Sequence, residues 1–184
     1  MRLFLALPLP PEVLKRLASA AEALRAGFPD LKVARPEGLH LTLVFLGERE
    51  PAEAEEVGRL LDSPLLAVPR IPAALGGYGQ FPPRGAPRVV FTPVKEGGEL
   101  VTALQRALSG VLTQGGIRLE EEARAFTPHI TLARSRGSGA ADPGELADLL
   151  GFEERFLFDR LVLFQSILRR DGAEYRALKS VMFR

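Results

Sequence analysis

The feature that most constrains this chain is a tetrapeptide that occurs twice. The chain has two histidines, and each begins the sequence His-apolar-Thr-Leu, first from His40 to Leu43 and again from His129 to Leu132. The hydrophobic patterning around both copies also recurs, in the order strand, helix, strand, helix, at a spacing of about 90 residues. An internal repeat of this kind predicts two structurally equivalent halves rather than two unrelated domains.

Apolar and turn-forming residues predict the elements of each half. The first half is predicted to hold a strand at 3–7, a helix at 11–24, a strand at 39–46 and a helix at 51–61. The second is predicted to hold a strand at 88–91, a helix at 99–112, a strand at 126–133 and a helix at 143–150. Short apolar runs predict strands joined by turns across 64–93, and two longer runs at 155–168 and 175–183 predict a closing β-hairpin around a turn at 170–172.

These elements predict an α+β fold, because strands and helices mix without the strict βαβ alternation of a parallel sheet. We expect residues 1–184 to form a single domain of two lobes related by a pseudo-twofold axis. Each lobe is expected to be an antiparallel sheet flanked by helices, with a central cleft between the lobes. The sequence contains no linker long enough to separate independent domains.

Composition removes several classes of function. The chain has no Cys, which excludes disulfides, thiol nucleophiles, Cys-type zinc sites and iron–sulfur clusters. Its 24 Lys plus Arg against 23 Asp plus Glu give a net charge of +1, which does not suit a protein that grips a long duplex through many phosphates. No segment approaches the ~18 apolar residues of a membrane span. We expect a cytoplasmic monomer with no membrane partner.

The repeated tetrapeptide predicts an acid–base site. Side chains alternate between the two faces of a strand, so His40 and Thr42 should share one face while Leu41 turns to the core, and the second copy should place His129 and Thr131 in the same way. If both faces line one cleft, one imidazole can remove a proton while the other donates one. The two threonine hydroxyls can hold the negative charge on phosphate oxygens. This division of labour suits cleavage of a phosphodiester and needs no cofactor or metal.

Three other interpretations stay open at this point. A lone histidine usually has a structural role, although two histidines in matching frames make that role the weaker interpretation. A metal site could be built from the two histidines and a carboxylate, although zinc normally takes at least three protein ligands. The same residues could also form a module that binds an RNA end or nucleotide phosphate with little turnover.

The paired motifs resemble those of the two-histidine (2H) phosphoesterase superfamily, and most closely its RNA 2′,3′-cyclic phosphodiesterase branch, also called 2′-5′ RNA ligase. The resemblance covers nearly the whole chain and extends into the closing hairpin. It is carried by the segments 2–6, 39–47, 128–134 and 165–168, together with Gly172 and Tyr175.

The resemblance implies a bilobal α+β fold that hydrolyses a 2′,3′-cyclic phosphate at an RNA end to a 2′-phosphate, with a weak reverse activity that joins 2′-5′ ends. The partners it implies are RNA ends or small nucleotides that carry such a phosphate. By the same resemblance His40 is the proton donor to the departing 3′ oxygen, and His129 is the acceptor that activates water. The spacing of the motifs alone does not make that assignment.

Four further residues are candidates for substrate binding. Arg134 follows the second motif and could reach a phosphate, but its position in the strand puts it on the face opposite His129 unless a local bulge intervenes. A surface ion pair is the other interpretation of Arg134. Phe45, Phe81 and Tyr175 are candidates for stacking on a base, with burial in the core as the alternative.

Overall fold

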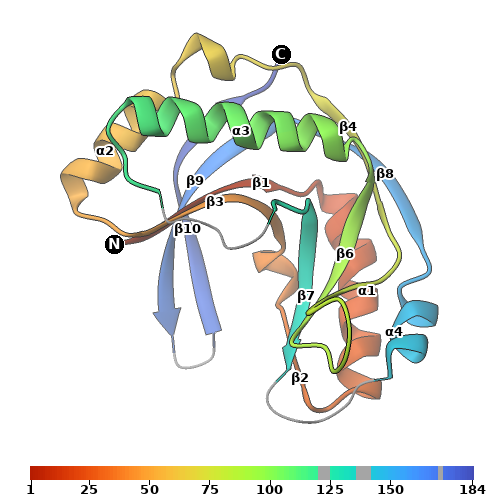
Figure 1. Ribbon diagram of the computed structural model, residues 1–184. Coiled ribbons are helices and arrows are strands. Elements are labelled where there is room, and N and C mark those ends of the chain that lie inside the picture. The colour runs from red at the N-terminus through yellow and green to blue at the C-terminus, as the bar shows by residue number, and fades with distance from the viewer. Residues whose placement is uncertain (120–124, 136–141, 170–171) are drawn as a thin grey trace.

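Two antiparallel sheets organise the chain. A computed structural model describes residues 1–119, 125–135, 142–169 and 172–184 (Figure 1). Its strands are β1 (Arg2–Pro8), β2 (Leu31–Val33), β3 (His40–Glu48), β4 (Ile71–Gly76), β5 (Gly79–Phe81), β6 (Val89–Glu96), β7 (His129–Ser135), β8 (Glu153–Phe158), β9 (Arg160–Arg169) and β10 (Gly172–Met182). One sheet has the strand order β10-β9-β1-β3, and the other has the order β2-β7-β6-β4-β8 with β5 paired to β6.

Helices lie against both sheets. The α-helices are α1 (Pro11–Gly27), α2 (Pro51–Leu60), α3 (Gly98–Gln114) and α4 (Pro143–Leu149), and short 3-10 helices span η1 (Pro36–Gly38) and η2 (Pro64–Leu66). In Figure 1, α2 and α3 lie along the sheet that contains β1 and β3, whereas α1 and α4 lie beside the sheet that contains β6 and β7. Thus α1, which follows β1 in sequence, contacts β2 and α4, and α3, which follows β6, contacts β3 and α2.

The predicted repeat is present in this topology. The first half runs β1, α1, β3, α2 and the second runs β6, α3, β7, α4, with β1 antiparallel to β3 and β6 antiparallel to β7. All four predicted helices occur within a few residues of their expected ends. The α+β fold with antiparallel sheets flanked by helices is confirmed. The short strand β2 was not predicted.

Local sequence explains where the helices begin. Helix α2 starts after Glu50 with a capping box, in which the Glu53 carboxylate accepts from the Glu50 backbone N–H at 3.0 Å. Helix α4 starts after Asp142, whose carboxylate accepts from the backbone N–H groups of Gly144 and Glu145 at 2.7 and 3.2 Å. In both helices an acidic side chain therefore satisfies N–H groups that have no partner within the helix.

The prediction of one continuous strand at 155–168 is wrong. The segment is divided at Asp159 into β8, which pairs with β4 of the second sheet, and β9, which pairs with β1 and β10 of the first. Only the part from Arg160 onward forms the predicted closing hairpin with β10. The predicted turn at 170–172 falls largely on residues 170–171, which lie outside the described residues.

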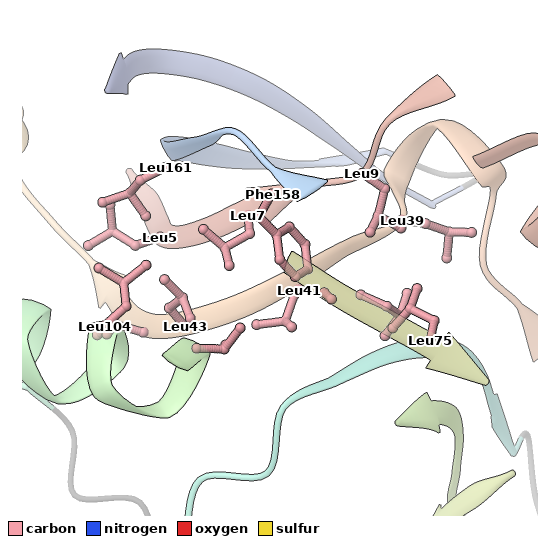
Figure 2. Packing of buried hydrophobic residues seen from close by; sticks show 14 of the residues in the cluster. Leu5, Leu7, Leu9, Leu39, Leu41, Leu43, Leu75, Leu104, Phe158 and Leu161 are labelled. Carbon is pink, nitrogen blue, oxygen red and sulfur yellow. The ribbon is translucent and has the colours of Figure 1, made fainter. Parts of the chain in front are cut away.

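One hydrophobic core contains residues from both sheets. Figure 2 shows Leu5 and Leu7 of β1, Leu41 and Leu43 of β3, Leu75 of β4, Leu104 of α3, Phe158 of β8 and Leu161 of β9 in this cluster. The six leucines of β1 and β3 are each at most 1% exposed. The core therefore occupies the helix-covered faces of β1 and β3 and leaves their opposite faces for other side chains. The assignment of residues 1–184 to a single two-lobed domain stays a prediction.

None of the helices in the described ranges is long and apolar enough to cross a membrane.

Candidate active site

The two motif strands, one from each sheet, lie close to each other. Several Cα atoms of β3 are within 8 Å of Cα atoms of β7. Both strands have the same burial pattern, in which the histidine and threonine are partly exposed and the residues between them are buried. The predicted alternation is therefore present in both copies. That the two histidines face one shared cleft stays a prediction.

Each histidine ring is held by a backbone carbonyl two residues earlier. The Nδ1 atom of His40 lies 2.7 Å from the Gly38 carbonyl oxygen, and Nδ1 of His129 lies 2.6 Å from the Thr127 carbonyl oxygen. Because a carbonyl oxygen can only accept, each Nδ1 carries the hydrogen of this bond. In the neutral ring Nε2 is then the basic nitrogen, so both copies present the same atom for proton exchange.

Aromatic rings surround His40. Phe4 of β1 stacks on the imidazole with ring centroids 4.8 Å apart and an interplanar angle of 29°. Tyr175 of β10 meets it edge-on, at 5.1 Å and 89°, and Phe164 of β9 lies 6.1 Å away. The side chain of Tyr175 also lies against Gly38, where an added Cβ would be 3.2 Å from the tyrosine ring. Three strands of the same sheet and a helical turn thus surround the ring of His40.

The second histidine has a corresponding support. Phe91 of β6 lies 4.7 Å from the His129 ring at 51°, and Phe81 of β5 meets that ring edge-on at 5.3 Å and 80°. Phe91 stands in the strand equivalent to β1 and lies against its histidine as Phe4 does, although Phe91 pairs with Thr131 whereas Phe4 pairs with Phe45. Phe81 resembles Tyr175 in its edge-on approach. Tyr175 and Phe81 therefore each support a histidine. The predicted role of these two rings in stacking on a base stays a prediction.

Burial in this aromatic surrounding changes the proton affinity of the first histidine. Desolvation lowers the pKa of His40 from 6.5 to about 4, against a smaller opposite effect of the Gly38 hydrogen bond. His40 is therefore neutral at pH 7 in the free protein. A role as proton donor requires a change in its surroundings that restores the proton.

A bulge interrupts both motif strands at the same place. In β3 the register with β1 shifts between Thr42 and Val44, and in β7 the register with β6 shifts between Thr131 and Ala133. In each strand two consecutive residues are buried at this point. The parity of the strand is reversed beyond the bulge, so the next exposed side chain returns to the face of the histidine.

The residues that follow the two bulges are Phe45 and Arg134. Phe45 is 50% exposed, and its ring lies 6.4 Å from that of Phe4. Arg134 is exposed and makes no ion pair within the described residues, which removes the surface ion pair as its explanation there. The bulge that the position of Arg134 requires is present in β7.

Sequence reasoning missed the rings that hold the histidines. The apolar pattern places Phe4 and Phe91 only in predicted strands, and the spacing of the two motifs does not align them, because Phe4 precedes His40 by 36 residues and Phe91 precedes His129 by 38. The recurrence of an aromatic residue in the strand before each motif strand was a signal that could have identified them. Phe164 had no such signal, because it belongs to the closing hairpin outside the repeat.

No group of three or more His, Asp or Glu side chains in the described ranges is arranged to hold a metal ion. The metal-independent mechanism stays a prediction.

Comparison with known proteins gives one family. A model of the 2′-5′ RNA ligase superfamily matches residues 10–169. An RNA 2′,3′-cyclic phosphodiesterase of Thermus thermophilus is 34% identical over 186 aligned positions, covering 100% of this chain and 91% of the relative. A protein of the same name from Archaeoglobus fulgidus is 33% identical, covering 97% of this chain and 98% of the relative.

Solved structures have the same fold. The crystal structure of TT0787 of Thermus thermophilus superposes with a TM-score of 0.82 at 31% identity, covering 100% of this chain and 98% of that one. The crystal structure of E. coli LigT complexed with 3′-AMP superposes with a TM-score of 0.75 at 26% identity, covering 99% of this chain and 97% of that one.

Proposed function

We propose that this chain, which belongs to the 2′-5′ RNA ligase superfamily, hydrolyses a 2′,3′-cyclic phosphate at an RNA end to a 2′-phosphate. The relatives named RNA 2′,3′-cyclic phosphodiesterase support this activity over the full length of the chain. The observation that carries the proposal is the repeated bond from histidine Nδ1 to a carbonyl oxygen. It leaves Nε2 of both His40 and His129 as the nitrogen that exchanges a proton.

The reaction needs one base and one acid. Nε2 of His129 removes a proton from water, and the oxygen of that water forms a bond to phosphorus. The bond between phosphorus and the 3′ oxygen breaks, and the proton on Nε2 of His40 moves to that oxygen. The products are a 3′ hydroxyl and a 2′-phosphate, and each histidine contributes roughly 10²–10⁴ to the rate.

Substrate binding raises the pKa of His40, as its role as the acid requires. The pKa of His40 is about 4 in the free protein because burial disfavours the charged ring. A cyclic phosphate carries a negative charge, and a negative charge beside an imidazole favours the imidazolium. His40 therefore takes up its proton as the substrate binds.

Other residues of the two strands bind the phosphate and the base. The hydroxyls of Thr42 and Thr131 share the faces of the two histidines and donate to the non-bridging oxygens, where charge develops during attack. Arg134 adds a cation beyond the second bulge. Phe45 offers a half-exposed ring beyond the first bulge, on which a base can stack.

The same arrangement supports ligation. If the 5′ hydroxyl of a second RNA replaces water, His129 removes its proton, and the bond between phosphorus and the 3′ oxygen breaks as before. The product is then a 2′-5′ phosphodiester rather than a 2′-phosphate. Because no other group changes its role, we propose this reaction as a weak second activity.

Single histidine variants test the proposal against the alternative of a binding module. His40→Ala and His129→Ala should each reduce hydrolysis of a cyclic-phosphate RNA end by about 10² or more, while binding of the 2′-phosphate product changes little. Thr113→Ala, at an exposed position near the end of α3, serves as the control variant. Equal and slow rates in the wild type and both histidine variants would show a binding module instead.

Chelation tests the metal-independent mechanism separately. Activity should be unchanged after prolonged exposure to EDTA, because both proton transfers are assigned to imidazoles. Loss of turnover on chelation and its recovery on addition of zinc would establish the metal site that the sequence left open.

A further inference from the structure

A second cation stands directly opposite Arg134. In the antiparallel pair of β2 and β7, Lys32 is the register partner of Arg134. Residues that are directly opposite in an antiparallel pair share one face, with Cβ atoms about 5 Å apart. Lys32 therefore lies on the same face of the sheet as His129, Thr131 and Arg134.

When no anion is bound, this placement of two cations destabilises the folded chain. Like charges directly opposite each other on neighbouring strands destabilise a sheet. Both side chains are exposed, and neither forms a hydrogen bond or an ion pair with any acidic side chain in the described part of the chain. An anion that binds between them would remove the repulsion.

The two cations belong to a row that reaches the candidate active site. The register partners across the sheet are Lys32 of β2, Arg134 of β7, Val89 of β6 and Phe81 of β5. The far end of the row touches the site, because the Phe81 ring lies 5.3 Å from the ring of His129. Along β7 the row lies about 13 Å from His129, given ~3.3 Å per residue and one bulged residue.

We propose that Lys32 and Arg134 together form a subsite for the phosphodiester that precedes the cyclic end of the RNA. The inference rests on the proposed function, because it assigns a place to the nucleotide next to the one that reacts. Arg134 lies on the same strand as His129 and Thr131, and its guanidinium contacts oxygens of both phosphates. Lys32 lies at the edge of the sheet, further from His129, and serves the second phosphate alone.

The subsite gives the protein a preference for an RNA end over a free nucleotide. A nucleoside 2′,3′-cyclic phosphate has one phosphate and leaves Lys32 without a partner. A dinucleotide that ends in a cyclic phosphate supplies the second phosphate. A charge-assisted contact at an exposed position should raise kcat/KM for the dinucleotide about three- to tenfold over the mononucleotide.

The experiment compares these two substrates in the wild type, Lys32→Gln, Lys32→Arg and the control Lys15→Gln. Lys15 is an exposed lysine of α1, so its variant removes the same charge away from the row. Lys32→Gln should abolish the preference for the dinucleotide and leave kcat/KM for the mononucleotide unchanged. It should also reduce the slope of log kcat/KM against log salt by about 0.7 for the dinucleotide. Lys32→Arg should keep the preference.

Stability provides a readout that separates this role from a structural one. Because Lys32→Gln removes the repulsion with Arg134, its free energy of unfolding should equal or exceed that of the wild type. Absence of a preference in the active wild type, an equal loss on both substrates in Lys32→Gln, or the same loss in Lys15→Gln would overturn the inference and leave the proposed function standing. Inactivity of the wild type on both substrates would instead overturn the proposed function, and the subsite with it.

Discussion

Phe45 and Arg134 occupy equivalent positions in the two halves of the molecule. Each follows its histidine by five residues, and each stands just beyond a bulge that returns its side chain to the face of that histidine. The backbone is thus repeated while the chemistry is not, because one copy offers an aromatic ring and the other a cation. The candidate site is therefore asymmetric, although it is built from two similar strands.

The first prediction separates the roles of these two residues. Phe45→Ala should lower kcat/KM for a nucleoside 2′,3′-cyclic phosphate about tenfold, since stacking on an aromatic ring contributes ~1–3 kcal/mol per base. It should leave turnover of base-free ribose 2′,3′-cyclic phosphate unchanged. Arg134→Gln should lower turnover of both compounds alike. Leu157→Ala, which truncates another exposed apolar residue at 45% exposure, is the control. Equal losses on both compounds in Phe45→Ala would contradict base stacking.

A second prediction concerns the proton on His40. Imidazole NMR should show His40 titrating at a pKa of about 4 in the free protein, because burial among aromatic rings disfavours the charged form. The chain has two histidines, so a spectrum of His129→Gln assigns the signal. Binding of a 2′-phosphate nucleotide should raise this pKa towards neutrality. If it stayed near 4 in the complex, His40 could not be the proton donor, and the two histidines would exchange roles.

The third prediction follows from the same group by linkage. The pKa of His40 is lower in the folded protein, about 4, than its ordinary value of 6.5, so the unfolded chain binds more protons between these values. The stability that this group contributes is complete above pH 6.5 and is lost as the pH falls towards 4, by at most about 3 kcal/mol. Denaturant unfolding of the wild type and His40→Gln across this range should show the wild type losing more. Parallel curves would contradict it.

A fourth prediction distinguishes support of the histidine from stacking on a base. Tyr175 meets the His40 ring edge-on and lies against Gly38. Tyr175→Phe should therefore retain activity, whereas Tyr175→Ala should lower kcat about tenfold or more with little change in KM, because a small misplacement of a reacting group is costly. The pKa of His40 should also rise in Tyr175→Ala as burial is relieved. A rise in KM alone would indicate that the tyrosine ring binds a base.

The fifth prediction concerns the core of the second sheet. Thr92 of β6 is fully buried, and its hydroxyl has no hydrogen-bond partner among the described residues. Thr92→Val should raise the free energy of unfolding by about 1 kcal/mol, because it removes the cost of burying an unpaired hydroxyl. Thr102→Val is the matched control, since the Thr102 hydroxyl donates to the Gly98 carbonyl at 2.8 Å. A loss of stability in Thr92→Val would mean that the hydroxyl has a partner, such as a bound water.

Much of the architecture could be predicted because its signals are local or repeated. Apolar spacing located all four helices, prolines marked the starts of α1, α2 and α4, and the two copies of the motif located β3 and β7. The alternation of His40, Leu41 and Thr42 predicted which side chains the core would take. The periodicity of a helix or a strand depends on residues that are only a few positions apart in the sequence.

Features that depend on pairing between strands could not be predicted in the same way. The bulges beyond Thr42 and Thr131 arise from the register with β1 and β6, which no single strand records. Position alone therefore placed Arg134 on the wrong face unless a bulge was assumed. The break at Asp159 was missed because apolar residues continue on both sides without a glycine or proline. The cation opposite Arg134 was missed because β2 is too short to give a periodic signal.

The single residue between β8 and β9 has a mechanical consequence. Asp159 joins a strand of one sheet to a strand of the other, and the buried side chains of Phe158 and Leu161 anchor the chain on both sides of it. One residue spans only about 3.5 Å even when fully extended, so this connection has almost no slack. Separation of the two strand ends by more than this distance would have to pull one of these side chains out of the core. The two sheets are therefore joined at this point of the chain without a flexible linker.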